Sequence, residues 1–365
     1  MKICIINSLY TPYYRGGAEL VVKKDVDRLK SYGHEVFVIT VCPWEGRKSM
    51  KPKIDEIEGV KIYRFYPFNL FSFVNINKKP MWLRLPWHFF DIFNIHSYFT
   101  VKKILQREKT DLVLTHNLKG IGYTVWRAIK DLKIKNTHII HDVQLVVPSG
   151  LLLFGREKIV NGIFYKIYSA TCRLLINSPD EVISPSRWLL DFYTQRGFFK
   201  DSKKIVNLAF GALPEVKQLN LEPQKETIKL IYVGQIEDHK GVVWLVEILK
   251  KIETDKLRNW KLDIIGDGTK LADIKKLVIK DKRVTIYGRV EGRDRDELIK
   301  QTDFVVVPSL CYENSPTIIS VALGLGIPVL AAKIGGIPEM VKEGVDGWLF
   351  TPNNSNDFLE KIFKF

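Results

Sequence analysis

One stretch of the sequence constrains the fold more than any other: residues 305–338, VVVPSLCYENSPTIISVALGLGIPVLAAKIGGIP. Residues 304–307 form a continuous apolar run, which predicts a strand buried on both faces. Ser315 and Pro316 then predict a helix start, with the serine as N-cap and the proline at the first helical position. A second apolar run and a Gly-Gly pair follow. This order of strand, loop, helix and strand indicates a unit of a parallel sheet.

The loop before this helix start carries residue types that suit a ligand. Free N–H groups at a helix N-terminus, placed at the carboxyl end of a parallel strand, bind phosphate well. Glu313 lies in the same loop and can accept hydrogen bonds from hydroxyls. Phosphate together with hydroxyls suggests a nucleotide-linked sugar. A structural strand–helix unit would show the same local pattern, so the pattern alone leaves both interpretations open.

Strands and helices alternate in two successive sets, separated by a polar, proline-containing linker at residues 220–227. A chain of 365 residues is longer than single cores usually grow. We therefore expect two doubly wound α/β domains with a cleft between them, at residues 1–219 and 220–352. In the first set we expect strands at 2–7, 34–41, 60–65, 111–116, 137–142 and 181–186, and helices at 18–32, 86–107, 122–130, 159–176 and 187–196. In the second we expect strands at 228–234, 260–265, 283–287, 304–307 and 347–350, and helices at 242–252, 270–279 and 295–302, after Ser315 and from 356.

Composition bounds the class of protein. The four cysteines are scattered without metal-ligand spacing, which argues against a zinc site or a disulfide framework. The N-terminus lacks a signal-peptide layout, and no apolar run reaches the ~18 residues of a membrane span. We therefore expect an intracellular protein. The net charge of +15 favours an anionic partner.

The basic charge is concentrated between Lys61 and Lys109, where nine Lys or Arg residues accompany two acids and many aromatic residues. This mixture predicts contact with an anionic membrane surface. Single-stranded nucleic acid would use the same mixture, but no nucleic-acid-binding module is recognisable, so we expect no nucleic acid partner. The alternative interpretation is a core helix with a solvated basic face.

Three further places suit a ligand. Gly16 and Gly17 stand where a strand leads into a helix, and paired glycines allow close approach of the backbone to a ligand. His141 and Asp142 follow a predicted strand, at the edge of a parallel sheet where sites lie. His116 and Asn117 have the same placement. A tight turn explains the glycines equally well, and a structural histidine at a strand end is equally common.

Taken together, the motifs resemble the retaining glycosyltransferases of family 4, also called glycosyl transferases group 1. The resemblance covers nearly the whole chain. It implies the GT-B fold, which has two facing Rossmann-like domains and a deep inter-domain cleft. Residues 1–219 would form the acceptor domain, 220–352 the nucleotide-sugar donor domain, and 353–365 the start of a truncated C-terminal crossing helix. The motifs are GGAE at 16–19, HD at 141–142, ISPS at 183–186, VG at 233–234 with KG at 240–241, GDG at 266–268, PSLCYE at 308–313 and GGIPE at 335–339.

The resemblance also implies roles for single residues. His141 would help stabilise an oxocarbenium-like state, and Glu313 would hold the donor sugar's hydroxyls. The donor diphosphate would meet Lys240 and the backbone N–H of Gly17. The complete set implied for donor binding is Gly16, Gly17, Gln235, Lys240, Asn314, Ser315, Pro316, Thr317 and Ile318, and weaker acceptor or cleft candidates are His116, Asn117 and Asp142.

The same resemblance implies partners and a location. The co-substrate would be a UDP- or GDP-linked sugar, with no other cofactor and no metal, because a lysine and helix N-termini would neutralise the leaving diphosphate. Asp294 and Asp296 flank an arginine in a predicted helix start, which does not suit a metal-binding acid pair. The acceptor would be a saccharide or lipid-linked saccharide of surface polysaccharide synthesis. The protein would be cytoplasmic and peripheral on the inner face of the plasma membrane. The base, the sugar, the acceptor and the linkage stay open.

The sequence departs from the family pattern at three points. Val321 stands where the family's E-x7-E motif has its second glutamate, which grips the ribose. Gln235 stands where the family usually has an arginine, and the chain stops at Phe365. Losing one charged hydrogen bond to a bound anion costs about 1.5–3 kcal/mol. The alternative to an active transferase is therefore a degenerate or partner-dependent GT-B protein that acts as a binding or scaffold subunit.

Overall fold

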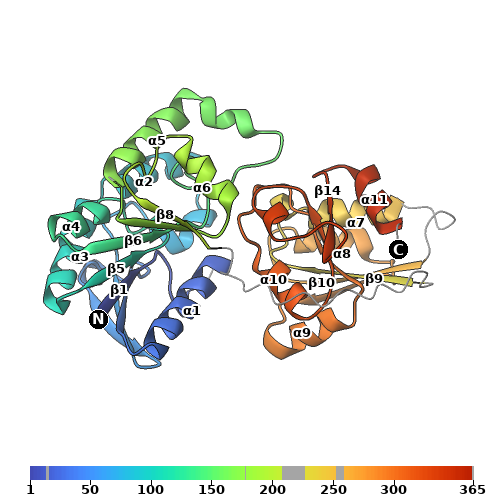
Figure 1. Cartoon of the computed structure of the whole chain (residues 1–365), viewed down its shortest axis with the longest axis horizontal. Coiled ribbons are helices and arrows are strands. Elements are labelled where there is room, and N and C mark those ends of the chain that lie inside the picture. The colour runs from blue at the N-terminus through green and yellow to red at the C-terminus, as the bar shows by residue number, and fades with distance from the viewer. Residues whose placement is uncertain (14–15, 177, 208–226, 252–258, 364–365) are drawn as a thin grey trace. The chain divides into compact units, whose positions relative to one another are not determined.

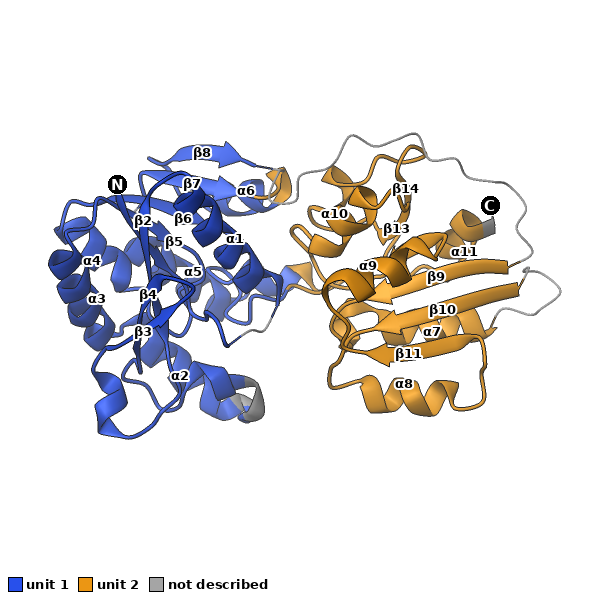
Figure 2. Cartoon of the chain, turned by 90° about the horizontal axis from the view of Figure 1, so that it is seen from below, with its two compact units in different colours: residues 1–151, 158–184, 189–207 blue, residues 152–157, 185–188, 208–365 orange. Residues whose placement is uncertain are grey.

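A computed structural model of the chain describes residues 1–13, 16–176, 178–207, 227–251 and 259–363. The chain divides into two compact units, coloured separately in Figure 2. The first comprises residues 1–151, 158–184 and 189–207, and the second comprises residues 152–157, 185–188 and 208–365. The expected linker at 220–227, with the boundary at 219, lies outside the described residues except for Thr227. Two short segments of the N-terminal half thus belong to the second unit.

The described part of the first unit contains an eight-stranded sheet in the order β3-β4-β2-β1-β5-β6-β7-β8. Its described pairs are parallel, apart from the antiparallel pair of β3 and β4. The sequence did not predict β3 or β8, because neither strand has a buried apolar face. The strands are β1 Lys2–Ile6, β2 Glu35–Val41, β3 Lys53–Ile57, β4 Val60–Phe65, β5 Leu112–Thr115, β6 Lys135–Ile139, β7 Glu181–Ser184 and β8 Lys203–Val206.

Helices cover both faces of this sheet, with α1 on one side and α3 and α4 on the other (Figure 2). The single helix predicted at 86–107 is wrong, since the chain forms two helices that meet at Asn94. The Asn94 side chain accepts the N–H of Ser97 at 3.0 Å and so caps the second helix. The elements are α1 Gly17–Ser31, α2 Met81–Ile92, α3 Ile95–Glu108, α4 Val125–Asp131, α5 Ile163–Ile176 and α6 Arg187–Thr194, with short 3-10 turns η1 Arg47–Met50, η2 Phe73–Lys78 and η3 Glu157–Asn161.

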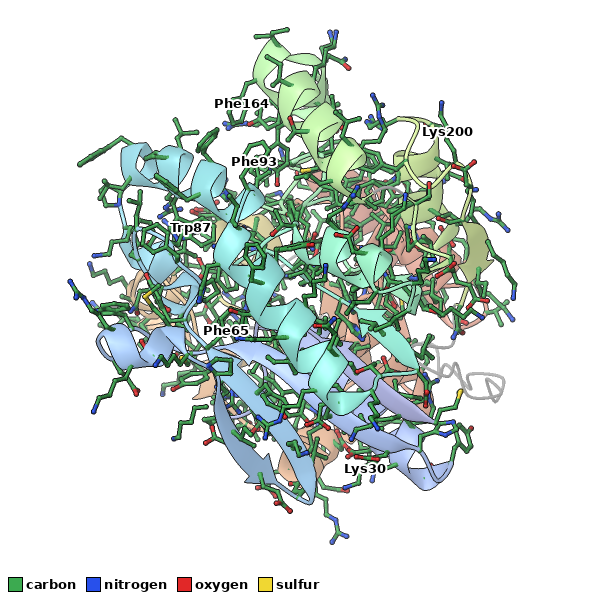
Figure 3. The ribbon with its side chains drawn as sticks, turned by 90° about the vertical axis from the view of Figure 1, so that its left-hand side faces the viewer. Lys30, Phe65, Trp87, Phe93, Phe164 and Lys200 are labelled. Carbon is green, nitrogen blue, oxygen red and sulfur yellow. The ribbon has the colours of Figure 1, made fainter. Side chains whose placement is uncertain are left out.

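Aromatic residues of the first unit divide between core and surface (Figure 3). Phe65 on β4 and Trp87 on α2 are buried, and the Trp87 indole donates to the carbonyl of Phe71 at 2.7 Å. By contrast, Phe93 at the end of α2 and Phe164 on α5 are exposed. The aromatic stretch of the sequence therefore contributes some residues to the core and others to the surface.

Within residues 227–363 the second unit has a fully parallel six-stranded sheet, in the order β11-β10-β9-β12-β13-β14. Helices α7 and α8 lie on one face, and α9 and α10 on the other (Figure 1). The C-terminal helix α11 buries Phe358 and Ile362 in this unit's own core. The strands are β9 Thr227–Val233, β10 Asn259–Ile265, β11 Val284–Gly288, β12 Phe304–Val307, β13 Val329–Ala332 and β14 Gly347–Phe350; the helices are α7 Val242–Lys251, α8 Leu271–Val278, α9 Gly292–Lys300, α10 Thr317–Gly324 and α11 Ser355–Phe363, with 3-10 turns η5 Asp238–Lys240 and η6 Ile337–Glu339.

Each sheet reverses its strand order at one place. In the first unit the order turns between β1 and β5, and in the second between β9 and β12. Ligands of doubly wound folds bind outside the carboxyl ends of the strands at such switch points. His116 directly follows β5, and Glu313 stands in the loop that follows β12. Both places predicted from the sequence therefore lie where this fold class forms its sites.

Candidate functional site

The switch point of the second unit brings Lys240 and Glu313 together. The ammonium Nζ of Lys240 lies 2.5 Å from Oε1 of Glu313. Lys240 ends the short turn η5 after β9, and Glu313 lies in the loop after β12, 73 positions along the chain. The Ser309 hydroxyl also donates to Oε1 of Glu313, at 3.1 Å. The predicted cation and the predicted acid thus form one partly buried ion pair.

Burial and charge oppose each other in this pair. Burial by itself would raise the pKa of Glu313, but the ammonium of Lys240 outweighs it and lowers that pKa below the usual value. Burial would likewise lower the pKa of Lys240, and the Glu313 carboxylate raises it instead. Both groups are therefore charged at neutral pH. A charged pair at a strand edge can exchange its internal contact for contacts with a phosphate and with hydroxyls.

Glycine geometry sets the position of Lys240. Gly241 follows it at a φ of +74°, and a Cβ there would lie 1.8 Å from the carbonyl oxygen of Pro308. The loops after β9 and β12 also share a hydrogen bond from the N–H of Leu310 to the carbonyl of His239, at 2.9 Å. Only a residue without a side chain allows this approach. Close packing against the carbonyl of Pro308 therefore explains why the KG motif has a glycine.

The Gly-Gly turn after β13 holds the other partner of the pair. A Cβ on Gly335 would lie 2.1 Å from the carbonyl oxygen of Glu313, and one on Gly336 would lie 2.0 Å from that of Asn314. The Gly336 N–H donates to the Glu313 carbonyl at 2.8 Å. Asn314 is buried and accepts a hydrogen bond from the Ser186 hydroxyl. The backbone of Glu313 is consequently fixed from two sides.

The helix that follows, α10, begins one residue later than predicted. Its N-cap is Pro316 rather than Ser315, and Thr317 is the first helical residue. Pro316 has an extended ψ of 116°, which places it outside the helix. The first N–H groups of α10, at Thr317 and Ile318, have no partner within the helix. Val321 is half-buried and packs on the core of this unit.

Gln235 is exposed on the loop after β9. Two hydrogen bonds fix the backbone of this loop. The Tyr232 hydroxyl donates to the Gln235 carbonyl at 2.6 Å, and the Ile236 N–H donates to the Asp267 carbonyl at 2.9 Å. A Cβ on Gly266 would lie 1.8 Å from the carbonyl oxygen of Gly234. The GDG motif therefore supports the loop on which Gln235 and Lys240 stand.

Two segments missed as part of this site pack on the Glu313 loop. Trp188 stacks on Tyr312 with ring centroids 5.1 Å apart, and the Tyr312 hydroxyl donates to Glu157 at 2.8 Å. The carboxylate of Glu339 accepts the N–H groups of Arg187 and Trp188 at 2.6 and 2.7 Å. The sequence contains the ISPS and GGIPE motifs, but they lie about 150 positions apart, so it could not predict the contact between Glu339 and residues 187–188.

The first unit gathers a second cluster, around His116 and His141. Nδ1 of His116 lies 2.9 Å from Nε2 of His141, and the two rings are stacked. Nε2 of His116 faces Oδ2 of Asp25 at 3.9 Å. Both of these facing atoms are buried without a hydrogen bond. The sequence did not predict Asp25 as part of this cluster. Asp25 lies on the buried side of α1, and the helical pattern does not show that His116, after β5, would face it.

Burial keeps the two histidines of this cluster neutral. It lowers the pKa of His141 to about 4, and together with the nearby His141 and His138 it lowers the pKa of His116 well below the usual value. Burial also raises the pKa of Asp25 to about 6. Two neutral imidazoles share one hydrogen bond when one ring donates and the other accepts. At neutral pH both rings are therefore neutral.

The remaining candidates of the first unit hold loops together. The Asn117 side chain accepts from Gln144 at 2.5 Å, and its N–H donates to Asn7 after β1 at 3.0 Å. The Asp142 carboxylate accepts the N–H of Gln144 at 2.8 Å, and burial raises its pKa to about 6. These contacts give Asn117 and Asp142 a structural part at the switch point of the sheet.

The glycine pair stands at the start of α1. Gly17 is the first helical residue, and the N–H of Gly16 donates to Oε2 of Glu19 at 2.8 Å. The backbone of Gly16 is extended, with a φ of −168°. The Gly17 N–H belongs to the first helical turn, whose N–H groups have no partner within the helix.

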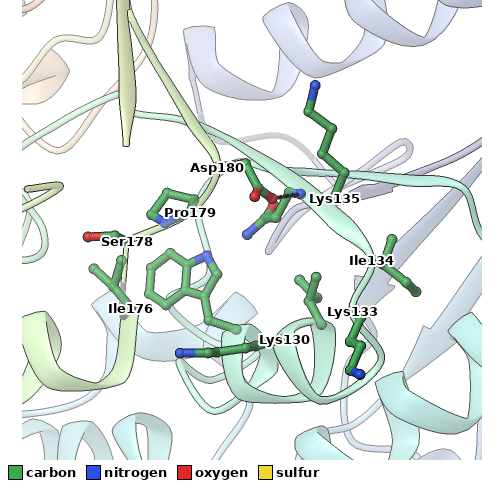
Figure 4. A pocket seen from close by; sticks show the side chains of 11 residues that line it. Lys130, Lys133, Ile134, Lys135, Ile176, Ser178, Pro179 and Asp180 are labelled. Carbon is green, nitrogen blue, oxygen red and sulfur yellow. Dashed lines mark hydrogen bonds between the residues drawn. The ribbon is translucent and has the colours of Figure 1, made fainter. Parts of the chain in front are cut away.

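A separate pocket of about 420 Å³ lies in the first unit, at the amino ends of β6 and β7 (Figure 4). Lys130, Lys133 and Lys135 rim it, and the Asp180 carboxylate accepts the N–H of Asn136 there at 2.7 Å. This edge of the sheet is opposite to the one that carries His116 and His141. The pocket therefore does not belong to the candidate site. Across the described ranges, the structure contains no group of three His, Cys, Asp or Glu side chains arranged to hold a metal.

Two parallel-sheet α/β units, each with polar residues gathered at its switch point, define a protein of the GT-B class. The family model described as Glycosyltransferase Family 4 matches residues 15–206, and the model described as Glycosyl transferases group 1 matches residues 227–365. The chain therefore belongs to glycosyltransferase family 4 and is a glycosyltransferase.

Relatives and a solved structure agree with this assignment. An uncharacterized 42.6 kDa protein in the cps region of Klebsiella pneumoniae is 26% identical, over 93% of this chain and 87% of that protein. The lipopolysaccharide 1,2-N-acetylglucosaminetransferase of Salmonella typhimurium is 30% identical, over 60% of this chain and 63% of its own length. Anabaena HepE, solved in complex with UDP, superposes with a TM-score of 0.66 at 19% identity, covering 100% of this chain and 89% of that one.

Proposed function

We propose that the protein is a retaining glycosyltransferase of surface polysaccharide or glycoconjugate synthesis, which moves a sugar from a nucleoside-diphosphate donor to a saccharide or lipid-linked saccharide. One observation carries the proposal: Lys240 and Glu313 meet 2.5 Å apart at the switch point of the second unit, beside the start of α10. A cation, an acid and a helix N-terminus together match a phosphate joined to a hydroxylated ring.

Each member of this set has a separate task. The ammonium of Lys240 neutralises the diphosphate as it leaves, and the N–H groups of Thr317 and Ile318 contact the sugar and phosphate end. Glu313 exchanges its bond with Lys240 for the hydroxyls of the sugar. Gln235, Asn314, Ser315 and Pro316 complete the donor loops. Because charge on the diphosphate grows as its bond to the sugar breaks, the lysine stabilises the transition state more than the bound donor.

By the family resemblance, the remaining roles fall to residues of the first unit. His141, neutral at physiological pH, contacts the donor sugar near the reacting carbon without adding positive charge beside an oxocarbenium-like state. The Gly16-Gly17 backbone approaches the diphosphate. His116, Asn117 and Asp142 hold His141 and the neighbouring loop in place. Retention of the anomeric configuration rests on the family resemblance.

The donor is UDP- or GDP-linked, and the acceptor is presented at the inner face of the cytoplasmic membrane. Support for the donor comes from a structural neighbour solved with UDP, and support for the acceptor from a relative named for lipopolysaccharide. The basic and aromatic stretch Lys61–Lys109 supports a membrane location. No helix among the described residues has both the length and the apolar character needed to span a bilayer.

Calorimetry with UDP and GDP tests the donor site directly. We expect micromolar binding of one of them and loss of that binding in Lys240→Ala. Lys300→Ala is a matched control, because Lys300 also pairs with an acid of this unit, Glu297, at 2.7 Å, but stands before β12, at the opposite edge of the sheet from Glu313. Equal affinity in the Lys240 variant and the wild type would refute the site. Turnover of the matching nucleotide sugar, with the product anomer read by NMR, separates a transferase from a non-catalytic binding subunit.

A further inference from the structure

Helix α2 presents an apolar stripe to solvent. Trp82, Leu85 and Phe89, spaced three and four residues apart, lie on one side of the helix and are 54–70% exposed. Phe93 continues the stripe past the helix end, with its ring 5.3 Å from that of Phe89. Large apolar side chains that gather on one exposed face mark an interaction surface rather than chance exposure.

Helix α5 presents a second stripe, which the sequence did not connect with the first. Ile163, Ile167 and Leu174 are 74%, 61% and 79% exposed, at positions that share one side of a helix. The opposite side of α5 carries Tyr168 and Cys172, which are buried. The stripe is therefore a true face of a packed helix and not a frayed end.

The two helices are tied to one loop, residues 118–124. Its Gly120 N–H donates to the Asp91 carboxylate of α2 at 2.9 Å, and its Tyr123 hydroxyl lies 3.3 Å from that of Tyr168 on α5. Figure 3 shows the labelled Phe93, at the end of α2, and Phe164, near the start of α5, on the same side of the unit. We call the stripes on α2 and α5 together the two-helix face.

Charge around the two-helix face is basic. Lys158, Lys166 and Arg173 lie on or next to α5, and residues 158–176 contain no acid. The acid of α2, Asp91, is buried, and burial raises its pKa to about 7. Glu108 at the end of α3 is also buried, where it pairs with Lys2 and Lys61. Helices α2 and α5 themselves therefore carry cations and no exposed acid, and Glu157, the acid next to Lys158, is half-buried and bonded to Tyr312.

We propose that the two-helix face docks on an anionic lipid bilayer, with α2 and α5 lying in the interface. Exposed Trp, Phe and Ile side chains next to Lys and Arg are the combination that an acidic headgroup layer binds. A second copy of this chain is a worse occupant, because two equally basic faces would repel each other.

Helix α5 stands between the two-helix face and the candidate site of the first unit. The Tyr168 hydroxyl of α5 donates to the carbonyl of Gln144 at 2.9 Å, and the Gln144 side chain reaches Asn117. Gln144 is three residues from His141. A lipid-linked acceptor held in the bilayer would therefore reach the histidine cluster by passing around α5. This step rests on the proposed transferase function, whereas bilayer docking itself does not.

Co-sedimentation with vesicles tests the proposal. We expect the protein to bind phosphatidylcholine vesicles that contain about a quarter phosphatidylglycerol, and to dissociate as salt rises from about 50 to about 500 mM. Phe89→Ser with Ile167→Ser should lower the partition coefficient at least tenfold. Ile279→Ser is the matched control, since Ile279 is 81% exposed on the second unit. Circular dichroism checks that all variants are folded.

Charge variants provide an independent reading. Lys158→Glu with Lys166→Glu should weaken binding by at least about fivefold for each cation removed, and Lys275→Glu with Lys276→Glu on α8 should not. Absence of binding to acidic vesicles at low salt would overturn the proposal. The proposal would also be overturned if sedimentation velocity showed a dimer and the Phe89→Ser and Ile167→Ser substitutions converted it to a monomer. Donor turnover on a soluble acceptor without vesicle binding would refute the docking alone, and vesicle binding without turnover would refute the transferase function alone.

Discussion

Lys240 and Glu313 form an ion pair with 2.5 Å between Nζ and Oε1, although 73 positions separate them in the chain. Their side chains are 25% and 16% exposed, so neither charge is fully solvated. Each group therefore depends on the other for its charged state in the ligand-free protein. The energetic coupling between the two charges can therefore be measured in the protein without a ligand.

Removing one partner leaves the other charge buried. Lys240→Met should lower the free energy of unfolding by about 3 kcal/mol, because an unpaired carboxylate at this depth is costly. The double variant Lys240→Met with Glu313→Gln should recover much of that loss. Denaturant unfolding at neutral pH measures both. Equal stability of the single and double variants would show that the pair is not coupled.

The same variant should change its stability with pH in a defined direction. Lys240 lowers the pKa of Glu313, so this contribution to the wild type is present above the unfolded value of about 4.3 and is lost as pH falls through the lower folded value. Without the lysine, burial raises the pKa of Glu313. The deficit of Lys240→Met relative to the wild type should therefore shrink as pH falls from about 7 to about 4. A constant deficit would contradict this.

A glycine comparison isolates the close contact that places Lys240. Gly241→Ala should weaken nucleoside-diphosphate binding at least tenfold, because the new Cβ would lie 1.8 Å from the Pro308 carbonyl oxygen. Gly326→Ala is the control, since Gly326 has nearly the same φ of +75° but open space around its Cβ position. Both variants carry the same backbone strain, so the difference in dissociation constant reports the clash. Similar affinities would mean that the loop position is unimportant.

Adding a cation at Gln235 should strengthen donor binding. The side chain is exposed on the donor loop, so Gln235→Arg buries no charge. A charged hydrogen bond to the diphosphate contributes about 1.5–3 kcal/mol, which corresponds to a roughly 10- to 150-fold lower dissociation constant. Gln235→Met controls for side-chain size. Calorimetry with the nucleoside diphosphate reads the effect, and unchanged affinity would place the diphosphate elsewhere.

Asp91 should make the first unit less stable at high pH. Burial raises its pKa to about 7, so its charged form is disfavoured in the folded state and stability falls as pH rises from about 4 through 7. Asp91→Asn keeps an acceptor for Gly120 and removes the charge. Its stability advantage over the wild type should grow by about 3 kcal/mol between pH 5 and pH 8. Asp27→Asn on α1, an exposed site, should show no such trend.

Prediction succeeded where the signal was local. The buried run at 304–307, the amphipathic α1 and the alternation of strands and helices followed from periodicity, and they fixed the α/β class. Periodicity failed at β3 and β8, which bury little, and at Asn94, where a cap divides one predicted helix into two. The helix start after Ser315 was displaced by one residue because Pro316 takes an extended backbone.

The sequence by itself determined the fold class and the family, because motif order and apolar period are properties of short segments, and it predicted Lys240, Glu313 and His141 as site residues. Only the tertiary structure decided that Lys240 pairs with Glu313, that Asp25 faces His116, and that α2 and α5 are both bonded to the loop at 118–124. The physical reason is strand order. Which loops meet depends on which strands become neighbours, and β9 beside β12 is a choice made by the whole core and not by either loop.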